Sequence, residues 1–196
     1  MGMDVYGKNP KLNKTIDSFP TMKKYDAMEF AEKWKILDKN EKEREKYWTE
    51  KDNFEDTNVG QYFRNNCWWW RPLWNYCFEV ADDIISEDVF NSGHSNNGAG
   101  LGSRDSKKLG NRLMECIADG STIKYQAEYI QWQDDLPDDD CMRCHNNNRG
   151  NNKKKDCTNC SQTGKTKSFD KSYPFDVDNV ERFARFCLES GGFEIC

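Results

Sequence analysis

Histidine and long apolar runs are scarce in this chain of 196 residues. It contains two histidines, and no stretch approaches the roughly 18 consecutive apolar residues that a membrane-spanning helix needs. No basic leader followed by an apolar run opens the chain, and no complete catalytic motif appears in it. We therefore expect a soluble protein of a reducing compartment, located in the cytoplasm and without a membrane partner.

Apolar residues make up only 36% of the chain, against 32% for charged residues. Aromatic residues nevertheless reach 13%, including seven tryptophans, which is too many for a disordered chain. We expect a compact, tryptophan-rich core. The formal net charge of −5 argues against a wholly basic nucleic-acid coat but permits a local basic patch.

Four of the nine cysteines form two C-x-x-C pairs. Cys141 pairs with Cys144, and Cys157 with Cys160, and twelve residues separate the pairs. This spacing can bring four thiolates to one tetrahedral ion, for which Zn²⁺ is the usual choice. Because four protein ligands leave no position for water, the site is expected to be structural rather than catalytic. His145 follows Cys144 directly and could replace one thiolate.

The other five cysteines allow two interpretations. They are either small buried apolar residues, which a reducing compartment favours, or members of disulfides. They are Cys67, Cys77, Cys116, Cys187 and Cys196.

The predicted zinc-binding module, residues 141–171, carries eight Lys or Arg and two Asp or Glu. Four thiolates with one Zn²⁺ add about −2, which leaves the module at about +4. Lys153, Lys154 and Lys155 would lie at the tip of its loop. They could bind the phosphates of a nucleic acid, keep the tip soluble, or dock on the acidic stretch 134–140.

Residues 11–59 read as a charged helical insertion or arm, with eleven Lys or Arg against twelve Asp or Glu. Asp26 and Glu29 predict a capping box before a helix, and residues 41–48 predict a second, solvated helix. The arm either binds a partner or is a solvated appendage.

The densest aromatic stretch is residues 60–74 (GQYFRNNCWWWRPLW). Pro72 suits the first turn of a helix whose apolar face continues to Ile84. The tryptophans either form the core or line a pocket in which a planar ligand stacks beside arginines. The ligand-binding candidates of this stretch are Arg64, Trp68, Trp69, Trp70 and Arg71.

His94 lies in a Gly/Asn/Ser-rich loop predicted at residues 91–103. It is the candidate catalytic residue because its ordinary pKa alone lies near neutrality, although a lone loop histidine is more often a surface residue. A pocket that combined this loop with Arg64 and Arg71 would suit a nucleotide-like anion.

Apolar spacing predicts three further helices and a pair of strands. Met3–Tyr6 and the segment from Phe193 to Cys196 read as short strands that pair with each other. The helices are expected from about Asp105, over residues 122–132, which carry Ile123, Ala127 and Ile130, and from a capping box of Asp178 and Glu181. The expected fold class is α+β, α-rich. A single core domain would comprise residues 1–140 and 172–196, with the zinc module inserted.

The cysteine pairs resemble half of the cysteine-rich zinc module of DnaJ-type co-chaperones, whose repeats run C-x-x-C-x-G-x-G. Gly164 matches one glycine of the second repeat, while Gln162, Asn146 and Asn148 stand at other glycine positions. The resemblance covers about thirty residues, with two repeats where the family has four and no J-domain signature. It implies a knuckle geometry and one zinc, without chaperone activity.

Most of the chain outside residues 11–59 is similar to an uncharacterised group of small phage and bacterial proteins. The shared stretches are MGMDVYGKNP, YFRNNCWWWRPLW, the glycine-rich loop, the paired C-x-x-C and SGGFEIC. The resemblance implies a phage source and no particular activity.

The leading hypothesis is a non-enzymatic, zinc-stabilised binding protein whose partner is a protein or a nucleic acid. The alternatives are a nucleotide-like ligand-binding protein or enzyme, and a virion or assembly component. The sequence does not indicate an oligomeric state.

Overall fold

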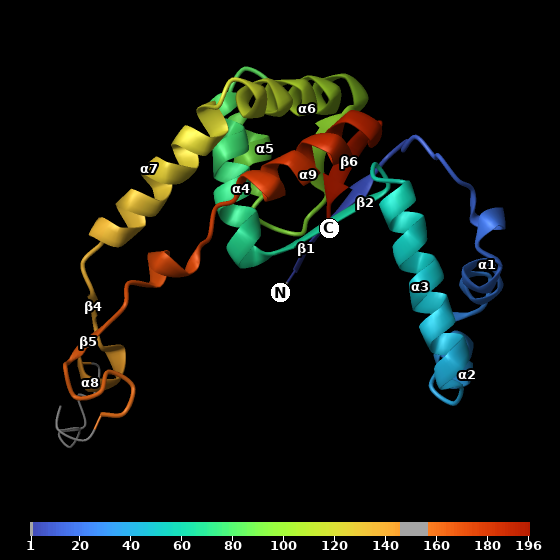
Figure 1. The fold of residues 1–196 in the computed structure, drawn as a ribbon, viewed down its shortest axis with the longest axis horizontal. Coiled ribbons are helices and arrows are strands. Elements are labelled where there is room, and N and C mark those ends of the chain that lie inside the picture. The colour runs from blue at the N-terminus through green and yellow to red at the C-terminus, as the bar shows by residue number, and fades with distance from the viewer. Residues whose placement is uncertain (1, 146–156) are drawn as a thin grey trace.

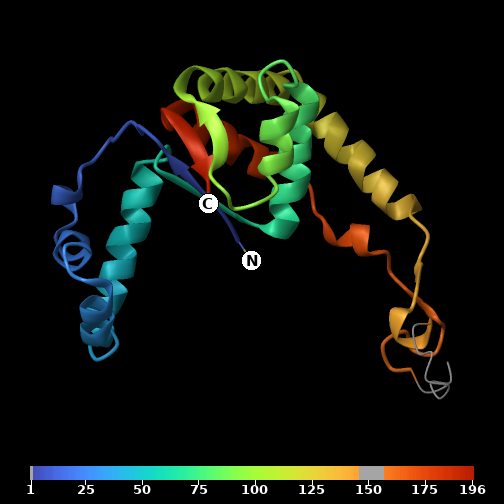
Figure 2. The same cartoon turned by 180° about the vertical axis from the view of Figure 1, so that it is seen from behind.

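The computed structural model describes residues 2–145 and 157–196 (Figure 1). A central body carries two projections, which extend from the same side of it and give the molecule the outline of an arch (Figures 1 and 2). In chain order the elements are β1 (Gly2–Gly7), η1 (Ile16–Ser18), α1 (Pro20–Asp26), α2 (Phe30–Leu37), α3 (Glu41–Thr57), β2 (Tyr62–Asn66), α4 (Cys67–Val80), α5 (Glu87–Ser92), β3 (Ala99–Gly102), α6 (Ser103–Ala118), α7 (Ser121–Asp135), β4 (Asp139–Asp140), α8 (Met142–His145), β5 (Lys165–Thr166), η3 (Phe169–Ser172), α9 (Val177–Glu189) and β6 (Gly192–Ile195).

The body is built on a four-stranded antiparallel sheet in the order β2-β1-β6-β3. The two chain ends supply its central pair, in which Val5 lies opposite Ile195. Alternate residues of the strands are buried on one face of the sheet, as the period of two requires. Polar residues occupy the other face, where Arg64 lies opposite Asp4, 3.5 Å away. The α-rich α+β fold and the pairing of the terminal strands are confirmed.

Helices α4, α6 and α9 cover the apolar face of the sheet and complete the core. Trp70 and Trp74 are fully buried there, and their rings stack 5.4 Å apart. Each indole N–H donates to a backbone carbonyl, Trp70 to Gly93 at 2.8 Å and Trp74 to Phe90 at 2.9 Å. The body therefore has the tryptophan-rich core that composition predicts.

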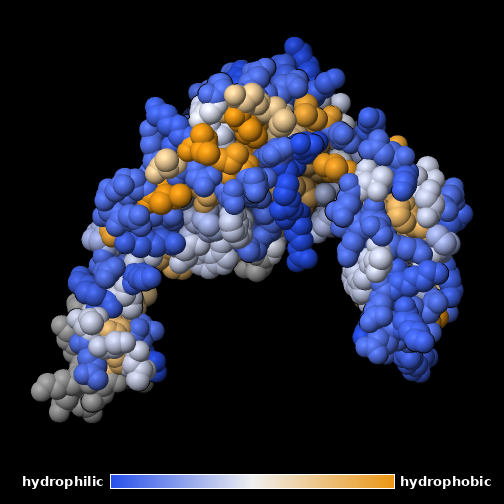
Figure 3. Space-filling model, viewed as in Figure 1, coloured by the Kyte–Doolittle hydropathy of each residue, from blue (hydrophilic) through white to orange (hydrophobic). Residues whose placement is uncertain are grey.

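The arm consists of η1, α1, α2 and α3 and has an apolar cluster of its own. Leu37, Tyr25 and Tyr47 are its most deeply buried members. Lys33 donates to Asp26 and to the Tyr47 hydroxyl at 2.5 Å each, so the ammonium group is paired within the arm. Figure 3 shows that the outer surface of this arm is mostly hydrophilic.

The second projection is formed by α7 and the cysteine module at its end (Figure 1). The module holds β4, α8 and β5, and its buried cluster consists of cysteines alone. Thus three separate buried clusters lie in the body, the arm and the module. The predicted domain boundaries stay a prediction.

Several local predictions are wrong in position. Helix α4 begins at Cys67 and not at Pro72, because the Asn66 side chain accepts hydrogen bonds from the Trp68 and Trp69 N–H groups. Residues 99–102, predicted as loop, form strand β3. The stretch 62–66 forms β2, a strand that was not predicted.

The two capping boxes are not formed either. Glu29 precedes α2 without a side-chain cap, and Asp26 bonds to Lys33 instead. Helix α9 is capped by Asp176, whose carboxylate accepts from the Asp178 N–H at 2.9 Å.

The helix predicted over residues 122–132 is present as α7, but its isoleucines lie outside the core. Ile123 is 65% exposed and Ile130 46% exposed, because α7 leaves the body after its first turns. Thr122 is buried there and bonds to the Tyr76 hydroxyl at 2.8 Å. In the part of the chain that the structure describes, no helix combines the length and the apolar character that crossing a membrane requires.

Candidate functional site

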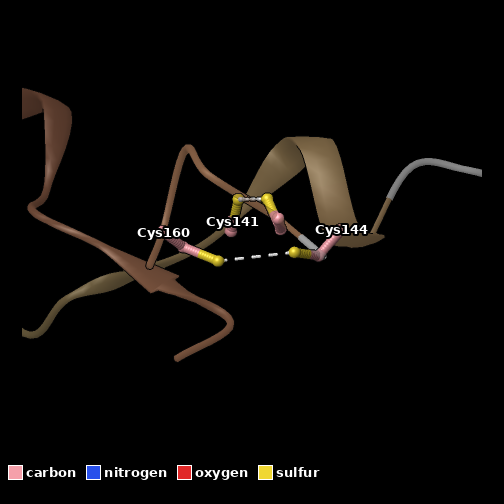
Figure 4. A group of neighbouring side chains, drawn as sticks. Cys141, Cys144 and Cys160 are labelled. Carbon is pink, nitrogen blue, oxygen red and sulfur yellow. Dashed lines mark hydrogen bonds between the residues drawn. The ribbon is translucent and has the colours of Figure 1, made fainter. Parts of the chain in front are cut away.

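The four cysteines of the C-x-x-C pairs converge at the far end of the second projection (Figure 4). Their sulfur atoms all lie within 4.8 Å of one another. Cys141 Sγ is 3.8 Å from Cys157 Sγ, and Cys144 Sγ is 3.4 Å from Cys160 Sγ. Thiolates around a tetrahedral zinc lie about 3.8 Å apart, as follows from a Zn–S bond of about 2.3 Å. The arrangement could therefore hold one metal ion.

Short local structures direct the sulfurs inward. Helix α8 begins directly after Cys141 and places Cys144 one turn later, with the Cys144 N–H bonded to the Cys141 carbonyl at 3.0 Å. The second pair is followed by Gln162 and Gly164, with φ of 69° and 79°. Both positions are left-handed, as expected for a C-x-x-C-x-G-x-G turn, and Gln162 adopts the conformation without being glycine.

Nearby N–H groups point to the sulfurs. The Asn159 side chain donates to Cys141 Sγ at 3.4 Å, and the Gly164 N–H donates to Cys160 Sγ at 3.3 Å. The Asn159 bond is the main reason that the pKa of Cys141 falls to about 6, while neighbouring thiols raise the pKa of Cys144. Donors of this kind favour a thiolate, the form that binds metal.

Several residues that the sequence analysis singled out in the module fall outside the described residues. Lys153, Lys154 and Lys155 lie outside them, as do Asn146 and Asn148. All nine cysteines are free, so Cys77 and Cys187 are buried apolar residues of the core.

The structure does not bring the predicted aromatic and basic candidates into one pocket. Trp70 is fully buried and unavailable to a ligand. Trp68 and Arg71 lie at the junction of body and module. Trp69 lines two surface hollows, one of them together with Arg64.

The junction cluster comprises Trp68, Arg71, Phe169 and Tyr173. Trp68 packs 5.1 Å from the Phe169 ring and 4.9 Å from the Tyr173 ring. Arg71 donates to the Tyr173 hydroxyl at 2.6 Å. Phe169 is 59% exposed, so the cluster presents aromatic surface beside the module.

His94 is half-buried and packs edge-on against Phe90, with ring centroids 5.0 Å apart. Burial and the charge of Arg71 lower its pKa, so the imidazole is neutral at pH 7. Among the described residues, no hydrogen bond links His94 to a nucleophile or a carboxylate that would complete a catalytic group. In the segment 91–103, which was predicted as a loop, the Gly98 N–H donates to the Ile195 carbonyl at 2.8 Å.

Sequence reasoning missed Asn65, Asn179 and Arg182, which line a hollow with Trp69. Asn65 and Asn179 lie 114 positions apart, and neither belongs to a recognisable motif. The available sequence signal was that Phe63 and Asn65 are two positions apart, which is the spacing of residues on one face of a strand.

Comparison with known proteins gives no match. The chain matches no protein-family model, and neither a curated protein nor a solved structure resembles it significantly. The function must therefore be argued from the geometry.

Proposed function

We propose that this chain is a non-enzymatic, zinc-stabilised interaction protein. Cys141, Cys144, Cys157 and Cys160 would hold one structural Zn²⁺. The observation that carries the proposal is the convergence of four sulfurs, from two segments, within 4.8 Å of one another. Thiolate ligands favour zinc over the hard cations, and a set of four closes the site.

The zinc would organise a surface rather than a reaction. The described residues of the module form no buried apolar cluster beyond the cysteines, so a bound ion would supply what a hydrophobic core supplies elsewhere. Met142 on α8 is 74% exposed, and Phe169 of the junction cluster is 59% exposed. Exposed apolar side chains beside a module that a metal ion holds rigid favour a binding surface.

The partner class stays a protein or a nucleic acid. The net positive charge of residues 141–171 supports a phosphate-bearing partner, and the exposed aromatic groups suit either class. A phage source, the kinship to small phage proteins and a role in a virion stay predictions.

The proposal is tested on purified full-length chain loaded with zinc. Metal analysis should find one zinc per chain. Fluorescein-labelled single- and double-stranded 20-mers, and cross-linking in cells that express the chain, then report on the partner. We expect the partner signal to fall in Cys157→Ser and in Phe169→Ser, and to persist in Phe30→Ser, which changes an exposed phenylalanine of the arm. Equal signals in all four proteins would refute the proposal.

A further inference from the structure

A hollow of about 200 Å³ opens on the body, and no residue of the cysteine module lines it. Its walls come from the edge strand β2, the first turn of α4 and the start of α9. A second hollow, of about 480 Å³, adjoins it and shares Asn65 and Trp69. The lining residues of the first are Asn65, Trp69, Asp176, Asp178, Asn179 and Arg182.

Two buried amides face this hollow with unused hydrogen-bonding groups. Asn65 and Asn179 are each 8% exposed, and Asn65 Nδ2 donates to Asn179 Oδ1 at 3.0 Å. That bond leaves Asn65 Oδ1 and Asn179 Nδ2 without a protein partner among the described residues. Exchanging the nitrogen and oxygen of both amides leaves the same complement of one acceptor and one donor group. Neither atom is among the fully buried unpaired groups of the described residues, so solvent in the hollow reaches both of them. A ligand that offers a donor and an acceptor can therefore bond to the pair.

Trp69 supplies an aromatic wall beside the amides. It is half-buried, and no other aromatic ring packs on it in the described part of the chain, whereas Trp68 and Trp70 each pack on neighbouring rings. A planar group can therefore stack there without displacing a protein ring.

Arginine side chains stand on both sides of the wall. Arg182 is exposed and lies over the Phe63 ring at 5.6 Å, and no carboxylate pairs with it among the described residues. The Arg64 side chain is 65% exposed, with Asp4 3.5 Å away, and lines the adjoining hollow. Asp176 and Asp178 make the first hollow unfavourable for several phosphates at once.

We propose that the hollow binds one nucleotide unit. The base stacks on Trp69, its polar edge bonds to Asn65 and Asn179, and its phosphate lies beside Arg182 or Arg64. A free nucleoside monophosphate and one unit of a single-stranded nucleic acid share this chemistry. The site uses no residue of the cysteine module, so the nucleotide proposal and the zinc proposal can be tested and refuted separately.

Calorimetric titration with AMP, GMP, CMP and UMP, and anisotropy with labelled ten-residue oligo(dT) and oligo(U), test the site on the full-length zinc-loaded protein. We expect saturable binding of at least one probe. Trp69→Ala should weaken it by about 5- to 150-fold, the effect of losing one base–aromatic stack. Arg182→Ala should weaken it about tenfold or more. The matched controls are Trp132→Ala, an exposed tryptophan of α7, and Arg185→Ala, an exposed arginine of α9 that pairs with Glu181.

Asn179→Asp tests the hydrogen bonds between the amide pair and the base. The substitution keeps the oxygen that accepts from Asn65 and replaces the free donor by an acceptor, so the preference among the four bases should change. Binding of the monophosphates identifies a nucleotide pocket, and binding of the oligomers alone identifies a single-strand site.

Three results would overturn the proposal. The first is no binding of any probe at millimolar nucleotide. The second is equal loss in the control and pocket variants, or an unchanged base preference in Asn179→Asp. The third is binding that survives Trp69→Ala and disappears when zinc is chelated, since the module would then be the site.

Discussion

Replacing Cys157 by serine should release the metal and unfold the cysteine module while the body stays folded. Few contacts other than the cysteines stabilise the described residues of the module. Their buried cluster is made of cysteines, and each strand of the module's sheet, β4 and β5, has two residues. The Lys165–Asp140 ion pair, at 2.7 Å, is exposed, so it contributes little to stability. A structural zinc contributes on the order of 10 kcal/mol, so its loss cannot be offset locally.

The body should barely respond to the same change. Its apolar cluster shares no residue with the cysteine cluster, and all seven tryptophans lie outside the module. The thermal midpoint followed by tryptophan fluorescence should therefore shift by less than about 3 °C, which corresponds to about 1 kcal/mol in a chain of this size. Far-UV ellipticity should change little, because the described α-helix of the module, α8, has four residues.

The assay pairs zinc analysis with the fluorescence melt and limited proteolysis. Cleavage in Cys157→Ser should appear first within residues 141–166. Cys196→Ser is the matched control, since Cys196 is an exposed cysteine far from the cluster, and it should retain one zinc. One zinc per chain in Cys157→Ser would refute the ligand assignment. A loss of the tryptophan-detected transition would refute the independence of body and module.

Three further substitutions test the fold, and a fourth tests the pH dependence of stability. In Gly100→Ala the new Cβ would lie 1.9 Å from the Phe193 carbonyl oxygen, so we expect a loss of more than about 3 kcal/mol in urea unfolding. Gly102→Ala, where nothing lies within 4 Å, should change stability by less than about 0.5 kcal/mol. Leu37→Ala empties a fully buried site of the arm and should cost about 2–5 kcal/mol there, with faster hydrogen exchange in α3 and unchanged exchange in α9. His94 has a pKa lowered by burial and by Arg71, so the unfolded chain takes up its proton first as the pH falls. The free energy of unfolding should therefore decrease below about pH 6.5, and His94→Gln should flatten that decrease.

The sequence is most informative where the relevant pattern is local. The C-x-x-C pairs are complete within twenty residues, and the spacing of Val180, Phe183 and Cys187 indicates the buried face of α9 directly. The terminal strands could be paired because both are short segments, bordered by glycine, in which apolar residues flank one acidic residue.

Longer-range relationships were not predictable. In strand β2 the buried residues, Phe63 and Asn65, alternate with more exposed ones. Because one of the buried residues is an asparagine, the sequence lacks the usual alternation of apolar and polar residues. Strand β3 contains two glycines, of which Gly100 allows close approach to β6, and such a sequence is typical of a turn. The exposed face of α7 could not be foreseen, since its apolar spacing fits a buried helix equally well. Asn65 and Asn179 meet only after β2 and α9 have packed.

The central strand pair sets an order for folding during synthesis. Val5 pairs with Ile195, so the body sheet cannot close until almost every residue present here has left the ribosome. The arm, which ends at residue 57, can form its own cluster much earlier. Until β6 arrives, the nascent chain keeps the apolar side of β1 uncovered, including Met3 and Val5. Closure that depends on such a distant pairing is slow, so this apolar surface is exposed to aggregation for most of the synthesis of these residues.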